Sequence, residues 1–171
     1  MVDGSAASTP RLRSFAAFCV LERSRICGAL RALTGGHRDV EDAVQEALLL
    51  ARHRWAEVGA YARPEAWVVR VALRMLVRWR GLDRDRFAEL ADDPVDGAAE
   101  RAFVHVERTT DLAVAIASLP PRQRDVLTLH YRLDLPVEQI AEVLELRPGT
   151  VRSALSRGRD ALALRWAGAG S

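Results

Sequence analysis

Residues 119–162 read LPPRQRDVLTLHYRLDLPVEQIAEVLELRPGTVRSALSRGRDAL, and the positions of their prolines and apolar residues predict a helix-turn-helix. Pro121 suits the first turn of a helix, because the N–H that proline lacks would be unbonded there anyway. Pro136 opens a second helix, and Pro148 opens a third after a turn at residues 145–147. The apolar residues that would pack together between the last two helices are Ile140, Leu144, Val151, Leu155 and Leu162.

The outward face of the last of these helices carries small residues and arginines. The second helix of such a motif enters the major groove of DNA, where arginine can bond guanine in a bidentate fashion and Thr150 can bond phosphate. The alternative is an ordinary helical hairpin with solvated arginines. The candidate DNA-contacting residues are Arg147, Gly149, Thr150, Arg152, Ser153, Ser156, Arg157 and Arg159.

Charge is unevenly distributed along the 171-residue chain, although its formal net charge is only +2. Residues 63–86 carry seven arginines against three acidic residues, and residues 147–165 carry five arginines against one acidic residue. Between them, residues 88–107 carry six acidic residues against one arginine. Basic patches supply the nonspecific part of nucleic-acid affinity. The pattern predicts an all-α protein with two small helical domains joined by an acidic linker, the C-terminal one a helix-turn-helix.

Other classes of function lack the residues that they would require. Cys19 and Cys27 would lie roughly 12 Å apart on one helix, which is too far for a disulfide. The sequence has no Cys/His group with zinc-ligand spacing, no nucleophile–base pair and no phosphate-binding loop, so we expect no catalytic residues, no metal and no cofactor. It also has no hydrophobic signal core and no apolar run near the roughly 18 residues of a membrane span, so we expect a cytoplasmic protein without a membrane partner.

Apolar residues at helical spacing predict three further helices, over residues 11–33, 39–55 and 64–80. In the second of these, Asp39 is expected to cap the first turn. Its polar face carries Asp42, Gln45 and Glu46 around the apolar Leu49. An acidic patch around an exposed leucine suits a basic protein partner, because charge sets the register while the apolar centre is buried. A simple solvated face is the alternative.

The third of these helices has a cationic side and an apolar side. Arg70, Arg74 and Arg78 form an arginine ridge along it, Trp67 lies on the same side, and Tyr61 lies in the preceding loop. Aromatic side chains beside arginines can stack unpaired bases and hold a single-stranded backbone. Trp67 is equally compatible with a role as a core anchor, since large aromatic residues are mostly buried.

Four motifs, in this order, resemble those of bacterial RNA polymerase sigma factors of the extracytoplasmic-function (ECF) branch. DVEDAVQEAL at residues 39–48 resembles the D-x-E-D-x-V-Q-E signature, and PEAWVVRVA at residues 64–72 resembles AW-x-x-R-[VI]-A. LPPRQR at residues 119–124 and GTVRS at residues 149–153 resemble the C-terminal pattern LPxxQR…GTVxS. The resemblance covers residues 11–166 and is closest to the short actinobacterial SigE-like group.

The resemblance implies a sigma factor that binds core RNA polymerase and promoter DNA and performs no catalysis itself. It implies region 2 at residues 11–83, a linker at residues 84–108 in the RNA exit path, and region 4 at residues 109–166. The clamp helices of the polymerase would contact Asp42, Gln45, Glu46 and Leu49. The minus-ten element would contact Tyr61, Trp67 and the arginine ridge, and the helix from Pro148 would read the minus-thirty-five element.

The chain departs from the family pattern at five positions. These departures affect the promoter sequence that it would recognise and its affinity for DNA more than its assignment to the family. The family usually has asparagine at the position of Arg74, often aspartate at Arg78, glycine at Glu145, serine at Arg147, and commonly a basic residue at Ala154. A stand-alone helix-turn-helix regulator is the alternative, although the sequence shows no heptad seam for a dimer. The resemblance implies that the free protein is a monomer. It does not identify the target promoters, nor does it say whether an anti-sigma factor controls the protein.

Overall fold

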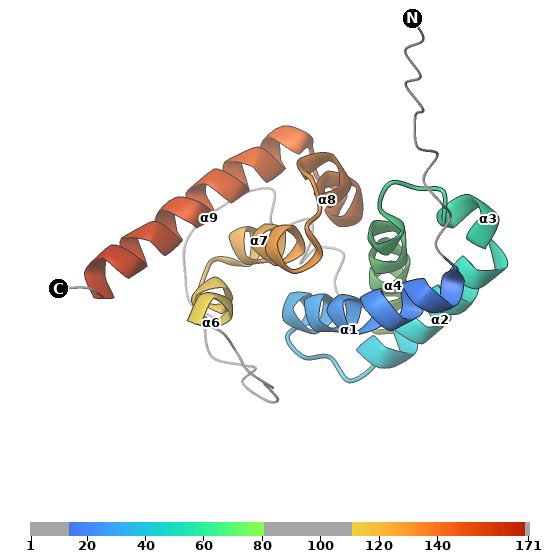
Figure 1. Cartoon of the computed structure of the whole chain (residues 1–171). Helices are drawn as coiled ribbons and strands as arrows, with labels where there is room; N and C mark the ends of the chain where they lie inside the picture. Colours follow the sequence, from blue (N-terminus) through green and yellow to red (C-terminus); the bar gives the residue numbers. More distant parts are fainter. Residues whose placement is uncertain (1–13, 81–110, 170–171) are drawn as a thin grey trace, which may run out of the picture.

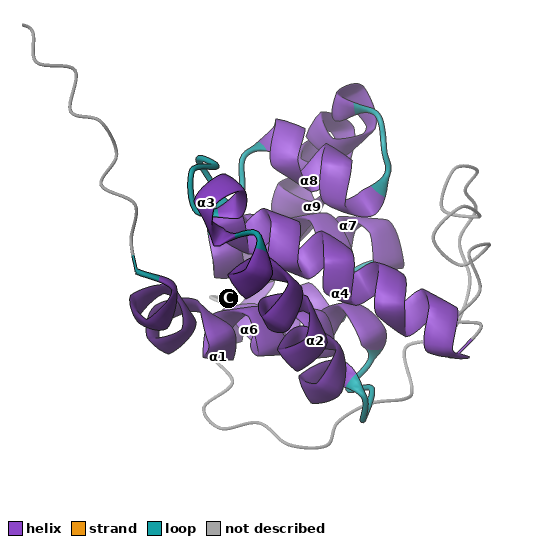
Figure 2. Ribbon diagram, turned by 90° about the vertical axis from the view of Figure 1, so that its right-hand side faces the viewer, coloured by secondary structure: helices purple, strands orange, loops and turns teal. Residues whose placement is uncertain are grey.

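The computed structural model of the chain describes residues 14–80 and 111–169, and these consist of helices and connecting turns without a β-strand (Figure 1; Figure 2). The all-α prediction is therefore confirmed for the described residues. The acidic linker predicted over residues 84–108 lies outside them. We refer to residues 14–80 as the N-lobe and to residues 111–169 as the C-lobe.

The N-lobe consists of α1 (Phe15–Thr34), α2 (Val40–His53), α3 (Trp55–Val58) and α4 (Pro64–Arg80). α1 begins where the Ser14 hydroxyl accepts a hydrogen bond from the backbone N–H of Ala17 at 3.2 Å. It ends at Gly35, whose φ of 69° suits a left-handed C-cap. α1, α2 and α4 pack around one core, and its fully buried side chains include Ile26, Leu30, Val44, Val68 and Leu76.

The predicted cap of α2 is wrong. Asp39 occupies the N-cap position, but its side chain makes no capping hydrogen bond, and its carboxylate lies 3.7 Å from Nε of Arg38. The helix also stops short of Trp55, which begins α3. The Trp55 ring lies against Phe15 and Phe18 of α1, with centroids 5.3 Å and 5.0 Å apart.

The C-lobe consists of α6 (Asp111–Ala117), α7 (Pro121–Leu133), α8 (Val137–Leu144) and α9 (Pro148–Ala169). Pro121 and Pro148 begin their helices and Pro136 is the N-cap of α8, so the three helices predicted from the prolines are confirmed. α6 is an additional short helix. A Cβ at Gly158 of α9 would lie 2.6 Å from Cδ1 of Leu127, so α9 crosses α7 too closely at this point for a larger residue.

The two lobes lie side by side in the described part of the chain. α1 packs against α7, and α4 packs against α8 (Figure 1). The approach of α1 to α7 is close at Gly28, where a Cβ would lie 3.2 Å from Nη1 of Arg132. The helical patterns of the sequence predicted each helix separately, but they did not predict this contact between the lobes.

Candidate functional site

The predicted DNA-contacting face of α9 is open to solvent. Val151, Leu155 and Leu162 on the other side of the helix are buried, as are Ile140 and Leu144 of α8. The structure thus gives the face the orientation that the residue spacing predicts, while its contact with DNA stays a prediction. Seven of the eight candidates are exposed and Thr150 is half-buried; the exposed ones are Arg147, Gly149, Arg152, Ser153, Ser156, Arg157 and Arg159.

Two arginines of this face have partners inside the C-lobe. Arg152 donates to Oε1 of Glu138 at 3.1 Å. Arg159 donates to the Tyr131 hydroxyl at 3.3 Å and to Nε2 of His130 at 2.9 Å. Nδ1 of His130 lies 3.1 Å from the carbonyl of Leu135, which can only accept, so Nδ1 carries the proton and Nε2 is the acceptor. Exposed contacts of this kind are weak, and phosphate can compete for the same guanidinium groups.

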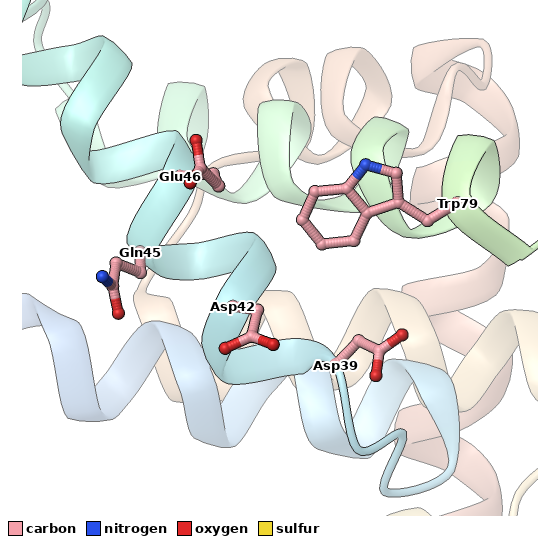
Figure 3. A pocket seen from close by; sticks show the side chains of 5 residues that line it. All are labelled: Asp39, Asp42, Gln45, Glu46 and Trp79. Atoms are coloured by element: carbon pink, nitrogen blue, oxygen red, sulfur yellow. The ribbon is translucent and has the colours of Figure 1, made fainter.

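The acidic face of α2 forms one wall of a surface hollow of about 490 Å³. Asp42 and Glu46 line it with Gln45 and Asp39, and the indole of Trp79 reaches toward them from α4 (Figure 3). Trp79 is 46% exposed, yet the predicted contact residues did not include it. The available signal was a large aromatic residue next to Arg78 on the polar side of an amphipathic helix.

Leu49 has the exposure that the helical pattern predicts. It is 41% exposed on α2, although it does not line the hollow. Its neighbour Leu50 is exposed to a similar extent, which the pattern did not predict. The exposed apolar surface of α2 is therefore wider than a single leucine.

The arginine ridge follows α4 as predicted, with Arg74 and Arg78 exposed and Arg70 half-buried. The structure supports the core role considered for Trp67, while stacking on unpaired bases stays a prediction. Trp67 packs against the N-lobe core, and its ring also lies under the guanidinium of Arg54, 5.8 Å from the centroid. It lines a cleft between the lobes together with Tyr61.

Tyr61 is held in place by a neighbouring carboxylate. Its hydroxyl donates to Oε1 of Glu57 at 2.6 Å, and Nη2 of Arg54 donates to both oxygens of Glu57 at 2.8 Å and 2.9 Å. The hydrogen bonds from Tyr61 and Arg54 lower the pKa of Glu57, and the bond to Glu57 raises the pKa of Tyr61. The aromatic ring is therefore positioned at the mouth of the cleft by a charged network.

Residues of α8 line the opposite side of this cleft, which measures about 340 Å³. Nη2 of Arg74 lies 3.0 Å from Oε1 of Glu145, and Nη1 of Arg70 lies 3.7 Å from Oε2 of Glu142. The structure therefore places Arg70 and Arg74, which are predicted to bind an opened strand, against the helix-turn-helix. The sequence pattern predicts these two parts as separate modules.

Cys19 and Cys27 are free thiols, as expected, and burial raises the pKa of each. Within residues 14–80 and 111–169, no group of His, Cys, Asp and Glu side chains could hold a metal ion. None of the described helices combines the length and the apolar character needed to cross a membrane.

Comparison with known proteins matches this chain to sigma factors. The family described as Sigma-70, region 4 matches residues 110–162. The ECF RNA polymerase sigma factor SigL of Mycobacterium tuberculosis is 34% identical over 141 residues, which cover 80% of this chain and 78% of SigL. The RNA polymerase sigma-E factor of Streptomyces coelicolor is 30% identical over 122 residues, covering 70% of this chain and 67% of that protein. SigW of Bacillus subtilis is 27% identical over 162 residues, 87% of each chain.

One solved structure is similar over most of the length. It is CnrH in complex with the cytosolic domain of CnrY, with a TM-score of 0.52 and 20% sequence identity. The match covers 90% of this chain and 88% of that chain. At this identity the likeness supports the fold alone.

Proposed function

This chain belongs to the family of ECF RNA polymerase sigma factors, and from that premise we propose that it binds core RNA polymerase and directs transcription initiation at promoters with two recognition elements. In this proposal residues 11–83 are region 2, residues 84–108 are the linker and residues 109–166 are region 4. The relatives are sigma factors, so the chemistry of RNA synthesis would belong to the polymerase, and the protein would act in the cytoplasm.

The observation that carries the proposal is the geometry of α9 within the matched segment. One side of this helix is buried, and the other presents arginines and small residues to solvent. A recognition helix needs this arrangement to enter the major groove, since small residues permit close approach and arginine can bond guanine. Region 4 would read the minus-thirty-five element through Arg152 and its neighbours on this face.

The hollow between α2 and α4 supports a contact with core polymerase. Asp42 and Glu46 supply negative charge, Gln45 supplies hydrogen-bonding capacity, and Trp79 adds an aromatic surface. Carboxylates beside an exposed indole suit arginine or lysine side chains of a partner. Leu49 would extend the contact along α2.

The arginine ridge supports a contact with the minus-ten element. Arg70, Arg74 and Arg78 would hold the backbone of the opened strand, while Tyr61 and Trp67 would stack on unpaired bases. Holding both elements on one chain raises the effective concentration of the second site once the first is bound. The separated lobes should therefore bind promoter DNA poorly.

Transcription by purified core polymerase tests the proposal. Core polymerase is given a library of promoter fragments with and without this protein, and the 5′ ends of the transcripts are sequenced. We expect new start sites that share an upstream and a downstream element. A stand-alone regulator would bind DNA but create no start site with core polymerase alone, and failure to associate with core polymerase at any ionic strength would overturn the proposal.

A triple variant tests the contact surface on α2. Replacing Asp42, Gln45 and Glu46 with alanine should reduce co-elution with core polymerase, because the negative charge of the hollow is lost. Asp160→Ala on α9 removes an exposed acidic residue elsewhere and should leave co-elution unchanged. Circular dichroism checks that both variants keep their helices. Equal co-elution of the triple variant and the control would remove these residues from the interface.

A further inference from the structure

Arg159 of α9 is held by two side chains of α7, a helix that packs against α9. Its Nε donates to the Tyr131 hydroxyl at 3.3 Å, and its Nη2 donates to Nε2 of His130 at 2.9 Å. The two acceptors are neighbours in sequence, and their rings lie edge to face with centroids 5.0 Å apart. Neither of them is among the DNA-contacting residues predicted from the sequence. The end of α7 is therefore connected to the exposed face of α9 through one arginine.

The imidazole of His130 is bound at both of its nitrogens. Nδ1 donates to the carbonyl oxygen of Leu135 at 3.1 Å, so Nε2 presents a lone pair to Arg159. His130 is half-buried, and Leu135 is fully buried in the connection between α7 and α8. The position of the guanidinium group is thus set by a ring that is itself fixed to buried backbone.

The two contacts occupy one edge of the Arg159 guanidinium and leave the other edge free. Arginine has five N–H donors in a planar fork, and only Nε and one N–H of Nη2 are used here. Within the described residues, Nη1 of Arg159 has no hydrogen-bond partner. The free edge, formed by Nη1 and Nη2, can donate two parallel hydrogen bonds to a phosphate.

The acceptors of Arg159 are neutral, unlike the partner of Arg152 on the same face. Arg152 pairs with the carboxylate of Glu138, so a phosphate must displace an opposite charge to bind it. The hydroxyl and the imidazole that hold Arg159 carry no charge in this arrangement, so its positive charge is not neutralised. A phosphate can therefore bind Arg159 while both acceptors stay in place.

Arg159 lies two helical turns beyond Arg152, about 10 Å further along α9. In a helix-turn-helix the first turns of the recognition helix contact the bases, and contacts to phosphate set its register on the duplex. We propose that His130 and Tyr131 are positioning residues, which hold Arg159 in the orientation that binds a phosphate beside the upstream element. This inference rests on the DNA-binding role proposed for α9.

The arrangement lowers the entropic cost of binding DNA. An unrestrained arginine on an exposed helix face loses many rotamers when it binds, whereas α7 already fixes the plane of the Arg159 guanidinium. Because phosphate is the same in every sequence, this contact strengthens binding to all duplexes alike and adds no base specificity.

Two substitutions of His130 separate its two hydrogen bonds. The amide N–H of His130→Asn lies near the position of Nδ1, so it keeps the bond to Leu135 but offers Arg159 no acceptor. The amide oxygen of His130→Gln lies near the position of Nε2, so it keeps an acceptor for Arg159 but loses the bond to Leu135. A positioning role predicts that only the glutamine variant retains DNA binding, and a purely structural role predicts the reverse.

Fluorescence anisotropy of the full chain with a duplex of mixed sequence measures these effects at several salt concentrations. Arg159→Ala should weaken binding about tenfold and reduce the salt slope by about 1, while His130→Asn should weaken binding about threefold. In the Arg159→Ala background, His130→Asn should have no further effect. In the Arg157→Ala background it should keep its full effect, because Arg157 is exposed on the same helix but does not contact His130.

Thermal unfolding followed by circular dichroism verifies that each variant is folded under the binding conditions. The proposal is overturned if His130→Asn binds DNA as the wild type does, or if His130→Gln binds as weakly as His130→Asn. It is also overturned if the effect of His130→Asn persists without Arg159.

NMR of the Arg159 side chain separates this inference from the function on which it rests. Without DNA, the Nε–H signal, assigned from its loss in Arg159→Lys, should exchange slowly with water in the wild type and faster in Tyr131→Phe. Equal exchange rates would overturn the positioning role even if the protein directs transcription. Slow exchange in the wild type, together with unchanged DNA binding by Arg159→Ala, would overturn the phosphate contact. Neither measurement requires core polymerase, whose new start sites test the sigma function independently.

Discussion

α4 of the N-lobe and α9 of the C-lobe both present a row of arginines, but the two rows have different partners. Arg152 and Arg159 of α9 contact side chains of their own lobe, and the face around them is exposed. Arg70 and Arg74 of α4 pair with carboxylates of the other lobe. The two rows therefore differ in which lobe supplies their partners and not in exposure, because the Arg74 and Arg152 side chains are both 62% exposed.

This difference separates the two DNA contacts that we propose. Arg152 of α9 would exchange a partner of its own lobe for DNA. Arg70 and Arg74 of α4 would exchange a carboxylate of the other lobe for phosphate.

Destabilising one lobe at a time tests whether the two lobes unfold independently. Leu127→Ala in α7 and Leu30→Ala in α1 each remove a fully buried leucine, and each should cost about 2–5 kcal/mol of unfolding free energy. Because most of the helix packing lies within each lobe, although α1 also packs against α7, we expect each substitution to lower the midpoint of its own lobe more than that of the other lobe. Urea unfolding is followed by circular dichroism and by tryptophan fluorescence, which is weighted toward the N-lobe through Trp55, Trp67 and Trp79. Equal fluorescence shifts for both variants would mean that the lobes unfold as one unit.

Arg152→Ala tests the open surface. If Arg152 reads a base, its loss should weaken binding to the upstream element by about 1–3 kcal/mol and relax specificity at one position. The measurement is fluorescence anisotropy with duplex DNA at several salt concentrations. Loss of a phosphate contact would instead weaken binding to all sequences alike and reduce the salt dependence. Glu138→Ala removes the partner of Arg152 and should not weaken binding to duplex DNA. Weaker DNA binding by this variant would contradict the role proposed for Arg152.

Glu145→Gly tests the contact between α4 and α8 through its effect on stability. Glycine removes the cost of a left-handed residue, so the C-lobe should gain about 1 kcal/mol of unfolding free energy. The same change removes the carboxylate that binds Arg74, so hydrogen exchange in α4 and α8 should become faster. Thermal unfolding and hydrogen exchange are measured on the same sample. A more stable C-lobe with unchanged hydrogen exchange in α4 would show that Glu145 does not stabilise the contact between α4 and α8.

Tyr61→Phe produces the smallest effect and tests the aromatic edge of the ridge. Tyr61 and Arg54 lower the pKa of Glu57 in the folded protein, so this carboxylate adds stability above its unfolded pKa of about 4.3, and the contribution is lost as pH falls through the lower folded pKa. Removing the Tyr61 hydroxyl should raise the pKa of Glu57 in the folded protein toward its usual value. The pH range over which the stabilising contribution of Glu57 is lost should therefore become narrower. An NMR titration of the Glu57 carboxyl measures the shift. An unchanged pKa would show that Tyr61 does not bind Glu57 in solution.

Most of the helices and their faces could be predicted because the signals are local. Pro121, Pro136 and Pro148 mark helix starts through their own geometry, and the buried positions of α9 repeat at the period of one helix. The exposed acids of α2 and the arginines of α4 follow from the same period. Local signals failed at Asp39, whose side chain makes no capping hydrogen bond, and at Trp55, which begins a separate short helix and packs on Phe15 and Phe18.

The partners of these faces could not be predicted, because they depend on contacts between distant parts of the chain. Trp79 is found with Asp42 and Glu46 only because α2 and α4 pack together. In the sequence, Arg74 and Glu145 are separate departures from the family pattern in two modules. The contact between the lobes pairs them.

The sequence by itself determined most of the helices, the exposed basic face of α9 and the family, since each follows from residues a few positions apart or from motifs along the chain. Only the tertiary structure decided which charged groups neutralise one another. Electrostatic pairing depends on distance through space, and the packing of α4 against α8 brings together groups that helical periodicity cannot relate.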